Sequence, residues 1–442
     1  MSCRRRVWRQ SCFPEACTIP VGAGLLANAV CHATEMLIDT PSSRASPLPH
    51  LAGVELAKAV RCSNTFNARL CKNLEPGSKL LIPTITQEDR TLSSPLRIAL
   101  IGTGNMGQQH YQQLKTLTEA TLCAVADPGP QAPGLAREWG VGYFADHRQM
   151  LEQAKPEAVI IANPNTLHVS TALDCLAAGV PVLLEKPVGV HLDEARELVA
   201  ASKSSGVPVL VGHHRRHNPL IVRAHELVHS GALGRLSTVT ALWQLRKPDS
   251  YFETAWRREP GAGMLLTNLI HDLDLLRHLC GEVRQVQAIT SNAVRGFANE
   301  DCAAVLLQFD NGALGSLTGS DAVAAPWSWE LGSGENPVYP RQADQPCYLL
   351  AGTAGALSIP QLKHWHYTQA DGGWHQPLAS TNEPFSVEPA LRLQLQHFVR
   401  VARGQVEPLV SAADAARTLA LVEAIRQAAE TGRACAPALI ED

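Results

Sequence analysis

The feature that most constrains this chain is an apolar stretch that runs directly into a glycine-rich turn. Residues 97–101 read Arg-Ile-Ala-Leu-Ile, and Gly102-Thr-Gly104-Asn-Met-Gly107 follows at once. The apolar stretch predicts a buried strand, and the residues after the turn predict a helix. Gly102 permits a tight turn, Gly104 lets a ligand approach the backbone, and Gly107 lets the helix lie close to the strand. Such a strand, turn and helix can hold a pyrophosphate at the helix amino terminus.

Short apolar segments alternate with helical segments from residue 96 to about residue 215. Strands separated by single helices predict right-handed βαβ units and a parallel sheet. The expected strands are 97–101, 122–126, 158–162, 180–184 and 208–211. We therefore expect a doubly wound Rossmann domain at residues 95–215.

The pattern changes in residues 216–442, where longer segments alternate apolar and polar residues. This alternation predicts an open, largely antiparallel sheet. The expected strands are 236–245, 283–290, 302–309 and 313–319, with a hairpin turn at Asp310-Asn311-Gly312 between the last two. Helical periodicity over 389–402 and 412–431 predicts helices that pack against the domains. The expected fold class is therefore α/β, with an N-terminal Rossmann sheet and a C-terminal α/β domain.

Composition excludes several classes of partner. The 442 residues are 45% hydrophobic and 18% charged, with a net charge of -3 and no basic stripe. Nucleic acid and acidic membrane surfaces are therefore not expected partners, and a small molecule is. The longest apolar stretches, such as 21–30, fall short of the ~20 residues that a membrane helix needs.

Residues 1–94 do not resemble the rest of the chain. They combine an arginine cluster, scattered cysteines and Pro/Ser-rich stretches, and they predict no domain. We expect a disordered extension or a start codon placed too far upstream. A twin-arginine export signal is the alternative, although Pro14 and Glu15 interrupt its apolar part. No C-x-x-C pair occurs, so we expect no metal site, and reduced thiols in a cytoplasmic protein.

An acidic residue follows the second expected strand. Asp127 lies 20 residues after Gly107, where a carboxylate can accept hydrogen bonds from the ribose hydroxyls of a dinucleotide. Residues 128–133 contain no lysine or arginine to neutralise a 2′-phosphate, which favours NAD over NADP. An aspartate that starts a turn before a proline is compatible with this role. Asn105 and Met106 of the glycine loop are also expected to contact the cofactor.

The tripeptide Glu185-Lys186-Pro187 closes the apolar segment 180–184. Lys186 is therefore expected where a buried parallel strand meets solvent at its carboxyl end, the edge at which open α/β sheets bind ligands. The alternative is a surface lysine held in a turn by the proline.

With these residues in view, the chain resembles the Gfo/Idh/MocA oxidoreductase family from about residue 96 to its end. Several motifs typical of the family follow the glycine loop in order. They are Ala-Asn-Pro-Asn-Thr-Leu-His at 162–168, Glu-Lys-Pro at 185–187, Val-Gly-His-His-Arg-Arg-His-Asn-Pro at 211–219 and Gly-Ala-Gly-Met-Leu-Leu-Thr-Asn-Leu-Ile-His-Asp-Leu-Asp at 261–274.

The resemblance implies pyridine-nucleotide-dependent oxidation of a sugar or polyol hydroxyl, with the C-terminal sheet as the interface of a homodimer or homotetramer. It places Asn163 and Pro164 beside the cofactor, and Glu185 and Lys186 beside the nicotinamide. His168 is either a further cofactor contact or a structural residue of its helix.

The same resemblance makes His271 the histidine that faces the substrate. A neutral histidine is a suitable base for a hydroxyl proton near pH 7, and a lysine cation can stabilise the developing alkoxide. A core histidine is the alternative. Many family members carry an aspartate four residues before this histidine, but here Thr267 occupies that position. Neither Thr267 nor Asn268 can supply the missing negative charge, whereas Asp274 lies on the same side of the helix.

Four residues are weaker candidates for contact with substrate: Arg216, Arg257, Thr267 and Asn268. The two arginines can equally pair with carboxylates between domains. Two other functions are also open. One is an NAD-dependent glycoside hydrolase, and the other is a regulator that binds the dinucleotide without catalysis. Lys186 and His271 argue against the regulator, and the missing aspartate argues for it.

Overall fold

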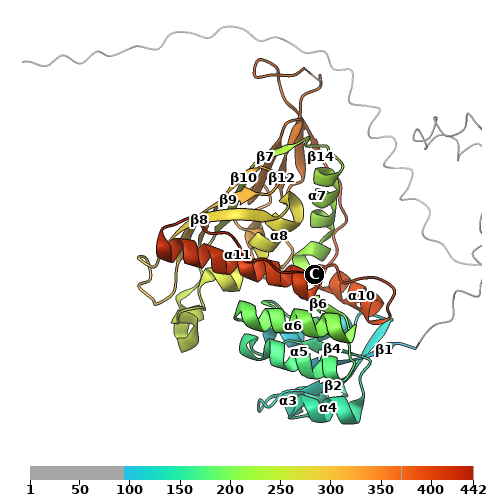
Figure 1. Ribbon diagram of the computed structural model, residues 1–442. Coiled ribbons are helices and arrows are strands. Elements are labelled where there is room, and N and C mark those ends of the chain that lie inside the picture. Colours follow the sequence, from blue (N-terminus) through green and yellow to red (C-terminus); the bar gives the residue numbers. More distant parts are fainter. Residues whose placement is uncertain (1–93, 370, 442) are drawn as a thin grey trace, which may run out of the picture. The chain divides into compact units, whose positions relative to one another are not determined.

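The structure is a computed structural model that describes residues 94–369 and 371–441 (Figure 1). The extension expected at residues 1–94 lies outside the described residues, apart from Ser94. No helix of the described residues is long and apolar enough to cross a bilayer.

The N-terminal part is a six-stranded parallel sheet with the strand order β3-β2-β1-β4-β5-β6, as in dinucleotide-binding folds. Five of the six strands were predicted. β3 was missed because its three residues carry no fully buried side chain and therefore give no apolar run. The strands are β1 Leu96–Ile101, β2 Ala120–Ala126, β3 Gly142–Phe144, β4 Ala158–Ile161, β5 Val182–Leu184 and β6 Val209–Val211.

Single helices connect these strands, as the alternating pattern predicted. α5 and α6 lie side by side against the sheet (Figure 1). The connecting helices are α2 Asn105–Leu114, α3 Ala132–Trp139, α4 His147–Ala154, the 3-10 turn η4 Asn165–Leu167 with α5 His168–Ala177, and α6 Leu192–Ser205. All six strands run in one direction, so their carboxyl ends, including those of β1, β2, β4 and β5, meet at one edge of the sheet.

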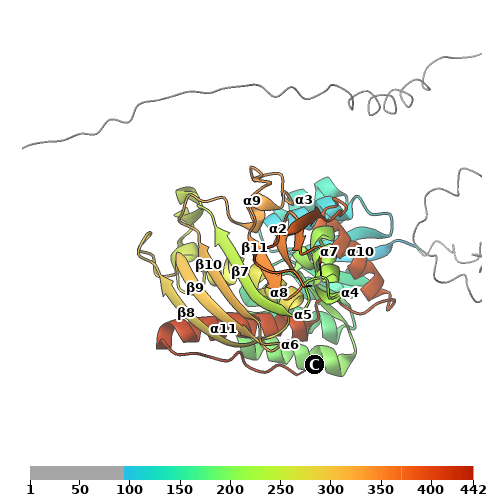
Figure 2. The same cartoon turned by 90° about the horizontal axis from the view of Figure 1, so that it is seen from above.

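The C-terminal part contains an eight-stranded mixed sheet with the order β14-β13-β12-β11-β7-β10-β9-β8 (Figure 2). Only β7 and β10 pair in parallel, so the sheet is largely antiparallel as expected. β9 and β10 form the predicted hairpin, in which Gly312 has a φ of 88°. The strands are β7 Leu236–Gln244, β8 Val283–Ser291, β9 Cys302–Phe309, β10 Leu314–Ser320, β11 Tyr348–Gly352, β12 Gly355–Ile359, β13 Lys363–His366 and β14 Ala379–Asn382.

The C-terminal part also contains helices and short helical turns. They are η5 His214–His217, α7 Pro219–His229, η6 Asp249–Glu253, η7 Ala255–Arg258, the π-helical turn η8 Leu265–Leu269, α8 Ile270–Cys280, α9 Trp329–Gly332, α10 Ala390–Ala402 and α11 Ala412–Thr431.

The last two helices join the two parts of the chain. α10 contacts α2, and α11 contacts α6, α8 and β8. Val211, the last residue of the edge strand β6, donates its backbone N–H to the carbonyl of Val410 at 2.9 Å. Residues 216–442 therefore do not form a wholly separate domain, because their C-terminal segment packs against the Rossmann sheet.

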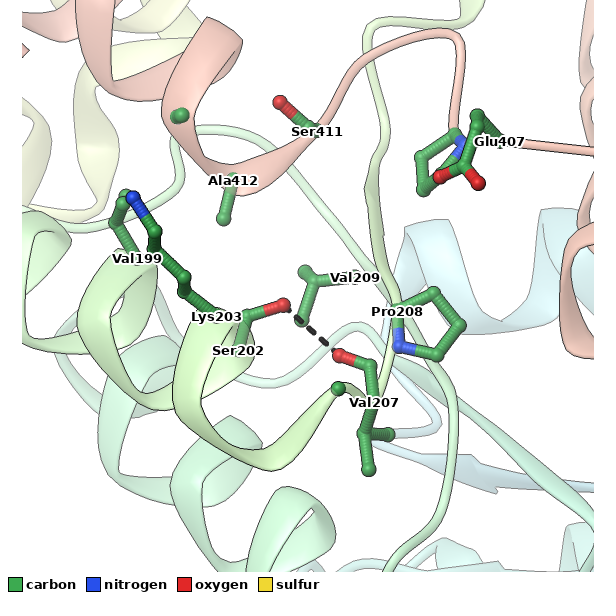
Figure 3. A pocket seen from close by; sticks show the side chains of 12 residues that line it. Val199, Ser202, Lys203, Val207, Pro208, Val209, Glu407, Ser411 and Ala412 are labelled. Carbon is green, nitrogen blue, oxygen red and sulfur yellow. Dashed lines mark hydrogen bonds between the residues drawn. The ribbon is translucent and has the colours of Figure 1, made fainter. Parts of the chain in front are cut away.

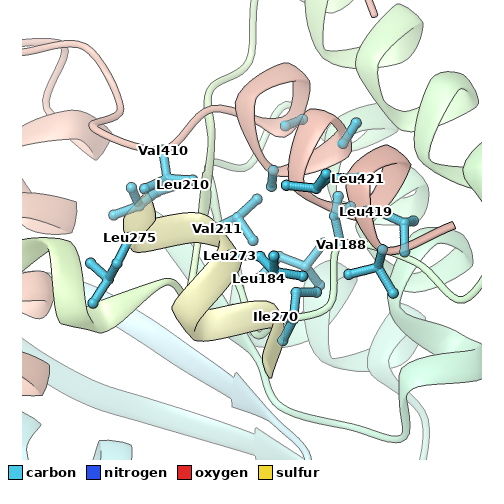
Figure 4. Packing of buried hydrophobic residues seen from close by; sticks show 14 of the residues in the cluster. Leu184, Val188, Leu210, Val211, Ile270, Leu273, Leu275, Val410, Leu419 and Leu421 are labelled. Atoms are coloured by element: carbon cyan, nitrogen blue, oxygen red, sulfur yellow. The ribbon is translucent and has the colours of Figure 1, made fainter. Parts of the chain in front are cut away.

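One continuous core runs between the two parts. Leu184, Val211, Ile270, Leu273 and Leu419 are all buried and pack in one cluster (Figure 4). This cluster fixes the end of β5 relative to α8, and these two elements carry Lys186 and His271.

Leu184 tests this packing, because it is fully buried and directly precedes Glu185. Leu184→Ala is expected to lower the free energy of unfolding by about 2–5 kcal/mol, measured by urea denaturation. Leu378→Ala is the matched control, since Leu378 is 51% exposed and its truncation should cost much less. Equal losses in the two variants would contradict the core assignment.

Candidate active site

The glycine loop between β1 and α2 has room for a ligand at one position only. A Cβ atom at Gly102 would collide with the carbonyl of Ala162, and one at Gly107 would collide with the carbonyl of Gly102. A Cβ at Gly104 would meet no atom within 4 Å. Gly102 and Gly107 are therefore required by the protein's own packing, whereas Gly104 borders open space.

The amino terminus of α2 offers backbone amides to that space. Gly104 is its N-cap and supplies no side-chain hydrogen bond. Asn105 is exposed and Met106 is half-buried in the first turn. Free amides and the positive end of a helix bind phosphate oxygens. These residues fit a dinucleotide pyrophosphate.

Asp127 follows β2 and ties it to the glycine loop. Its Oδ2 accepts hydrogen bonds from the Thr103 N–H at 2.6 Å and the Thr103 hydroxyl at 2.9 Å, and its Oδ1 accepts one from the Gly129 N–H at 2.6 Å. A carboxylate has about four acceptor positions, so one remains for a ribose hydroxyl.

The loop after β4 is held by side chains of α5. Asn163 donates from Nδ2 to the Thr171 hydroxyl at 2.9 Å, while Pro164 is exposed. The buried ring of His168 lies between two carbonyls, with Nδ1 2.7 Å from Pro187 O and Nε2 3.0 Å from Asn163 O. Burial lowers the pKa of His168. Its ring therefore joins this loop to the loop of Lys186, and neither ring nitrogen is left for a cofactor.

Glu185 points into the protein. Its Oε1 lies 2.7 Å from Nε2 of His110, a buried residue of α2. Burial would raise the pKa of Glu185, but the hydrogen bond from His110 lowers it below the usual value. The pairing with His110 was missed by the sequence analysis, and its only signal was a polar residue on the buried face of α2.

Lys186 reaches from the end of β5 to the segment that carries His271. Its Nζ donates a hydrogen bond to the backbone carbonyl of Thr267 at 3.0 Å, and it forms no ion pair within the described residues. Burial lowers the pKa of Lys186 to about 8, and the charges of Arg215 and Lys247 act in the same direction. Glu185 opposes this shift.

Thr267 lies on the π-helical turn η8, directly before α8. Its hydroxyl donates to the carbonyl of Gly263 at 2.9 Å and lies 2.9 Å from Oδ1 of Asn268. Single π-helical turns are frequent at functional sites. The side chains of Thr267 and Asn268 are thus bonded within the turn, and Thr267 contacts the lysine through its main chain.

His271 is the second residue of α8, directly after this π-helical turn. It is 8% exposed, and its Nδ1 is buried without a hydrogen-bond partner among the described residues. Its ring meets those of His213 and His214 edge-on, with centroids 6.0 and 5.3 Å apart. Burial lowers the pKa of His271 well below its usual value, and the charge of Lys186 adds to this effect. His271 is therefore neutral near pH 7, beside a lysine that is largely charged.

Comparison with known proteins identifies the family. An oxidoreductase family with an NAD-binding Rossmann fold matches residues 96–213, and the GFO/IDH/MocA C-terminal domain matches residues 221–358. Inositol 2-dehydrogenase of Rubrobacter xylanophilus is 31% identical over 253 residues, which are 54% of this chain and 68% of that relative. The chain belongs to the Gfo/Idh/MocA family of oxidoreductases. Its N-terminal part is an NAD-binding Rossmann domain.

Two further similarities agree with this membership. The NAD-dependent scyllo-inositol 2-dehydrogenase of Bacillus subtilis is 27% identical over 340 residues, covering 72% of this chain and 90% of that relative. The WlbA dehydrogenase of Bordetella pertussis, solved with NADH and UDP-GlcNAcA, is 23% identical. It has a TM-score of 0.63 and covers 78% of this chain and 99% of its own. The latter shows a shared fold.

Arg216 was predicted to contact substrate, and the structure corrects this prediction. Its Nε and Nη2 bind the two carboxylate oxygens of Asp274 at 2.8 and 2.7 Å, and its Nη1 binds Asp414 of α11 at 2.6 Å. Three of the five N–H groups of the guanidinium are thus bound by carboxylates. The alternative role, pairing with carboxylates, is the observed one, and both partners lie within residues 216–442. Asp274 is likewise held by Arg216 and is not a partner of His271.

Arg257 lies on η7 and is half-buried. Its Nη1 donates to the carbonyl of Tyr251 at 2.8 Å, and its guanidinium lies 4.1 Å from the centroid of the Tyr251 ring. It forms no ion pair within the described residues. Contact of Arg257 with substrate stays a prediction.

Two charged residues around the lysine, Lys247 and Glu330, were not among the predicted site residues. Arg215 pairs with Glu330 at 2.7 Å and lies 5.5 Å from the Trp329 ring, which is buried in the core. Lys247 is 9% exposed and lies 3.3 Å from a carboxylate oxygen of Asp321. Lys247 follows β7 and Glu330 lies on α9, so tertiary contacts bring both near the lysine without a local sequence signal.

A hollow of the described surface lies away from this site. It has a volume of about 350 Å³ and lies between α6 and the start of α11, at the amino end of β6 (Figure 3). Ser202, Lys203, Val207 and Ser411 line it. Lys186 lies at the opposite, carboxyl edge of the sheet.

The Arg216 ion pairs are expected to hold η5, α8 and α11 together. Burial would raise the pKa of Asp274, but Arg216 lowers it well below its usual range. This stabilisation is therefore present above the ordinary aspartate pKa of about 3.9 and lost as pH falls through the lowered value. Arg216→Met should cost about 3–5 kcal/mol at pH 7, because it removes the bidentate partner of the buried Asp274 carboxylate, whereas Asp414 keeps its ion pair with Arg277.

Urea denaturation measures this cost, which should shrink as the pH is lowered toward about 4 because Asp274 can then protonate in the variant. Arg148→Met is the control, since Arg148 forms an ion pair with Asp174 but its side chain is 64% exposed. It should change stability by less than about 1 kcal/mol. A cost for Arg216→Met that is independent of pH would contradict the assignment.

Proposed function

We propose that this chain is an NAD-dependent dehydrogenase that oxidises a hydroxyl carbon of a sugar, an inositol or a related polyol. The observation that carries the proposal is the hydrogen bond from the half-buried Lys186, at the carboxyl edge of the Rossmann sheet, to the turn that leads directly into His271. The names of relatives support the substrate class, since they include inositol 2-dehydrogenase and D-apiose dehydrogenase.

The glycine loop and Asp127 would hold the cofactor, with Asn163 and Pro164 beside it. When bound, NAD accepts the hydride from the carbon that is oxidised. The carboxylate of Asp127 would accept hydrogen bonds from the adenine ribose hydroxyls and repel a 2′-phosphate. No cation follows it in residues 128–133, which supports NAD over NADP.

The protein supplies the proton acceptor and the positive charge. His271 is neutral and therefore has a lone pair for the hydroxyl proton. The Lys186 ammonium stabilises the negative charge that develops on the hydroxyl oxygen. No carboxylate is required beside Lys186, because the Thr267 carbonyl binds its ammonium.

The outer face of the second sheet supports the proposed oligomer. Ile289, Leu306 and Leu314 of β8, β9 and β10 are more than half exposed there. A row of exposed apolar side chains on one sheet face is typical of an interface between subunits. We therefore propose a homodimer or homotetramer that forms through this face.

Loss of either reacting side chain tests the activity. Purified Lys186→Met and His271→Asn proteins are assayed with NAD and a panel of inositols, aldoses and amino sugars, by the absorbance of reduced cofactor. We expect the rate to fall at least about 100-fold in both variants, with NAD binding retained in calorimetry.

Lys115→Met is the control, because Lys115 is an exposed lysine at the end of α2. Turnover that survives in Lys186→Met would contradict the dehydrogenase proposal. Glycoside release that needs NAD without net reduction would indicate the NAD-dependent glycoside hydrolase. NAD binding without any turnover would indicate the regulator.

The pH dependence of kcat/KM distinguishes the roles of the two residues. Lys186 acts as a cation, and its pKa is about 8. We therefore expect alcohol oxidation to be constant from neutral pH to about pH 8 and to fall above it, as Lys186 loses its proton. Lys186→Arg should remove this fall, since arginine stays charged. A rate that rises through pH 8 would make Lys186 the base and contradict the assignment to His271.

A further inference from the structure

The glutamate that follows Asn299 touches the turn that carries Thr267. Oε1 of Glu300 accepts a hydrogen bond from the backbone N–H of Leu265 at 2.9 Å. A Cβ atom at Gly263 would collide with all three atoms of the same carboxylate. The carboxylate therefore lies directly against the backbone at the start of η8, and a side chain at position 263 would displace it.

Direct contacts lead from this carboxylate to the catalytic lysine. The carbonyl of Gly263 accepts hydrogen bonds from the Thr267 N–H at 3.2 Å and from the Thr267 hydroxyl at 2.9 Å. The carbonyl of Thr267 in turn accepts the hydrogen bond from Lys186 Nζ. A displacement of Gly263 would therefore move the acceptor that holds the ammonium of Lys186.

The neighbours of Glu300 fix it in place. Asn299, which is 7% exposed, donates from its side chain to the carbonyl of Arg257 at 2.9 Å. The buried carboxylate of Asp301 accepts hydrogen bonds from the N–H groups of Val294 and Arg295 at 3.0 and 2.7 Å. Glu300 thus projects from a segment that is anchored on both sides.

The negative charge of Glu300 is favourable where it lies, at the amino terminus of a helix. η8 has no side-chain cap from its own sequence. η8 and α8 follow one another without a break, so the carboxylate lies at the positive end of a helix that contains Thr267 and His271. It satisfies an amide that would otherwise have no partner in the helix.

We propose that Glu300 is a positioning residue of the active site, and that Gly263 is glycine so that the Glu300 carboxylate can lie against it. Glu300 sets the start of η8, and thereby holds the Thr267 carbonyl at the ammonium of Lys186. The effect on turnover rests on the proposed function, whereas the effect on Lys186 does not.

The pKa of the Lys186 ammonium can be measured without substrate turnover. The full-length protein is labelled with an amine-acylating reagent over a series of pH values, and mass spectrometry gives the pH dependence of labelling at Lys186. In Glu300→Ala we expect the pKa of Lys186 to fall further below about 8, because its ammonium loses a fixed acceptor. Glu300→Gln keeps the acceptor and the shape, and should stay close to the unmodified protein.

Glu157→Ala is the control for loss of a capping carboxylate, since Glu157 accepts a hydrogen bond from the backbone N–H of Arg97 far from the site. Glu157→Ala should leave the pKa of Lys186 unchanged. An equal shift in Glu300→Gln and Glu300→Ala would assign the effect to charge alone and overturn the positioning role. An unchanged pKa of Lys186 in Glu300→Ala would also overturn the positioning role.

A double-mutant cycle tests the reason for glycine at position 263. In the unmodified background we expect Gly263→Ala to lower kcat by about ten- to a hundredfold, with the KM for NAD little changed, because the helix start is displaced. In the Glu300→Ala background the same change should cost less than about threefold, since the colliding carboxylate is gone. Equal losses in both backgrounds would contradict the coupling.

The two failures can be told apart. If no substrate is oxidised but Lys186 labelling responds to Glu300→Ala and not to Glu300→Gln, the positioning role stands and the dehydrogenase proposal fails. If turnover depends on Lys186 while labelling is unaffected by Glu300, the positioning role fails alone.

Discussion

The hydrogen bond from Lys186 to the carbonyl of Thr267 joins the two halves of the active site. One partner stands at the end of a Rossmann strand, and the other lies on a π-helical turn of the second part of the chain. A carbonyl carries only a partial negative charge, so it orients the ammonium while leaving its pKa low. This explains how a lysine without a carboxylate partner can still be held in one place. Burial lowers the pKa of the nearby His271 and keeps its imidazole neutral, and the positive charge of Lys186 adds to this effect.

That hydrogen bond requires both halves to be fixed to within a fraction of an ångström, and two other features provide this. The first is the core that runs from Leu184 to Ile270 and Leu273 beneath the site. The second is the set of ion pairs through which Arg216 binds Asp274 and Asp414. A buried charge without a partner would lower the stability of the fold. The pairing of these charges therefore favours one arrangement of α8, α11 and the segment after β6.

The sequence predicted the elements whose local pattern is strong. Buried parallel strands give continuous apolar runs, so β1, β2, β4, β5 and β6 were found, and the Asn311-Gly312 turn predicted the β9–β10 hairpin. β11 to β14 were missed because short segments such as Lys363–His366 and Ala379–Asn382 have no apolar alternation. Their strand conformation depends on pairing with β7 and with one another.

The candidate site was predicted in part for the same physical reason. Glycines and a strand-end acid carry local signals, and motif order predicted that Lys186 and His271 belong together. Contacts made by the main chain give no local sequence signal. The role of the Thr267 carbonyl depends on a π-helical turn, which the sequence of residues 265–269 does not predict. The roles of Glu185 and Arg216 were also set by distant partners, His110 for the first and Asp274 for the second.

The most direct test of the central claim is the fate of hydrogen on the oxidised carbon. The protein is incubated with NAD and a panel of inositols and aldoses deuterated at their hydroxyl-bearing carbons, and the reduced cofactor is analysed by mass spectrometry. We expect one substrate class to place a single deuterium on the nicotinamide ring, with this transfer lost in His271→Asn. Bound NAD that gains no deuterium from any member of the panel would contradict the claim that this site oxidises polyols.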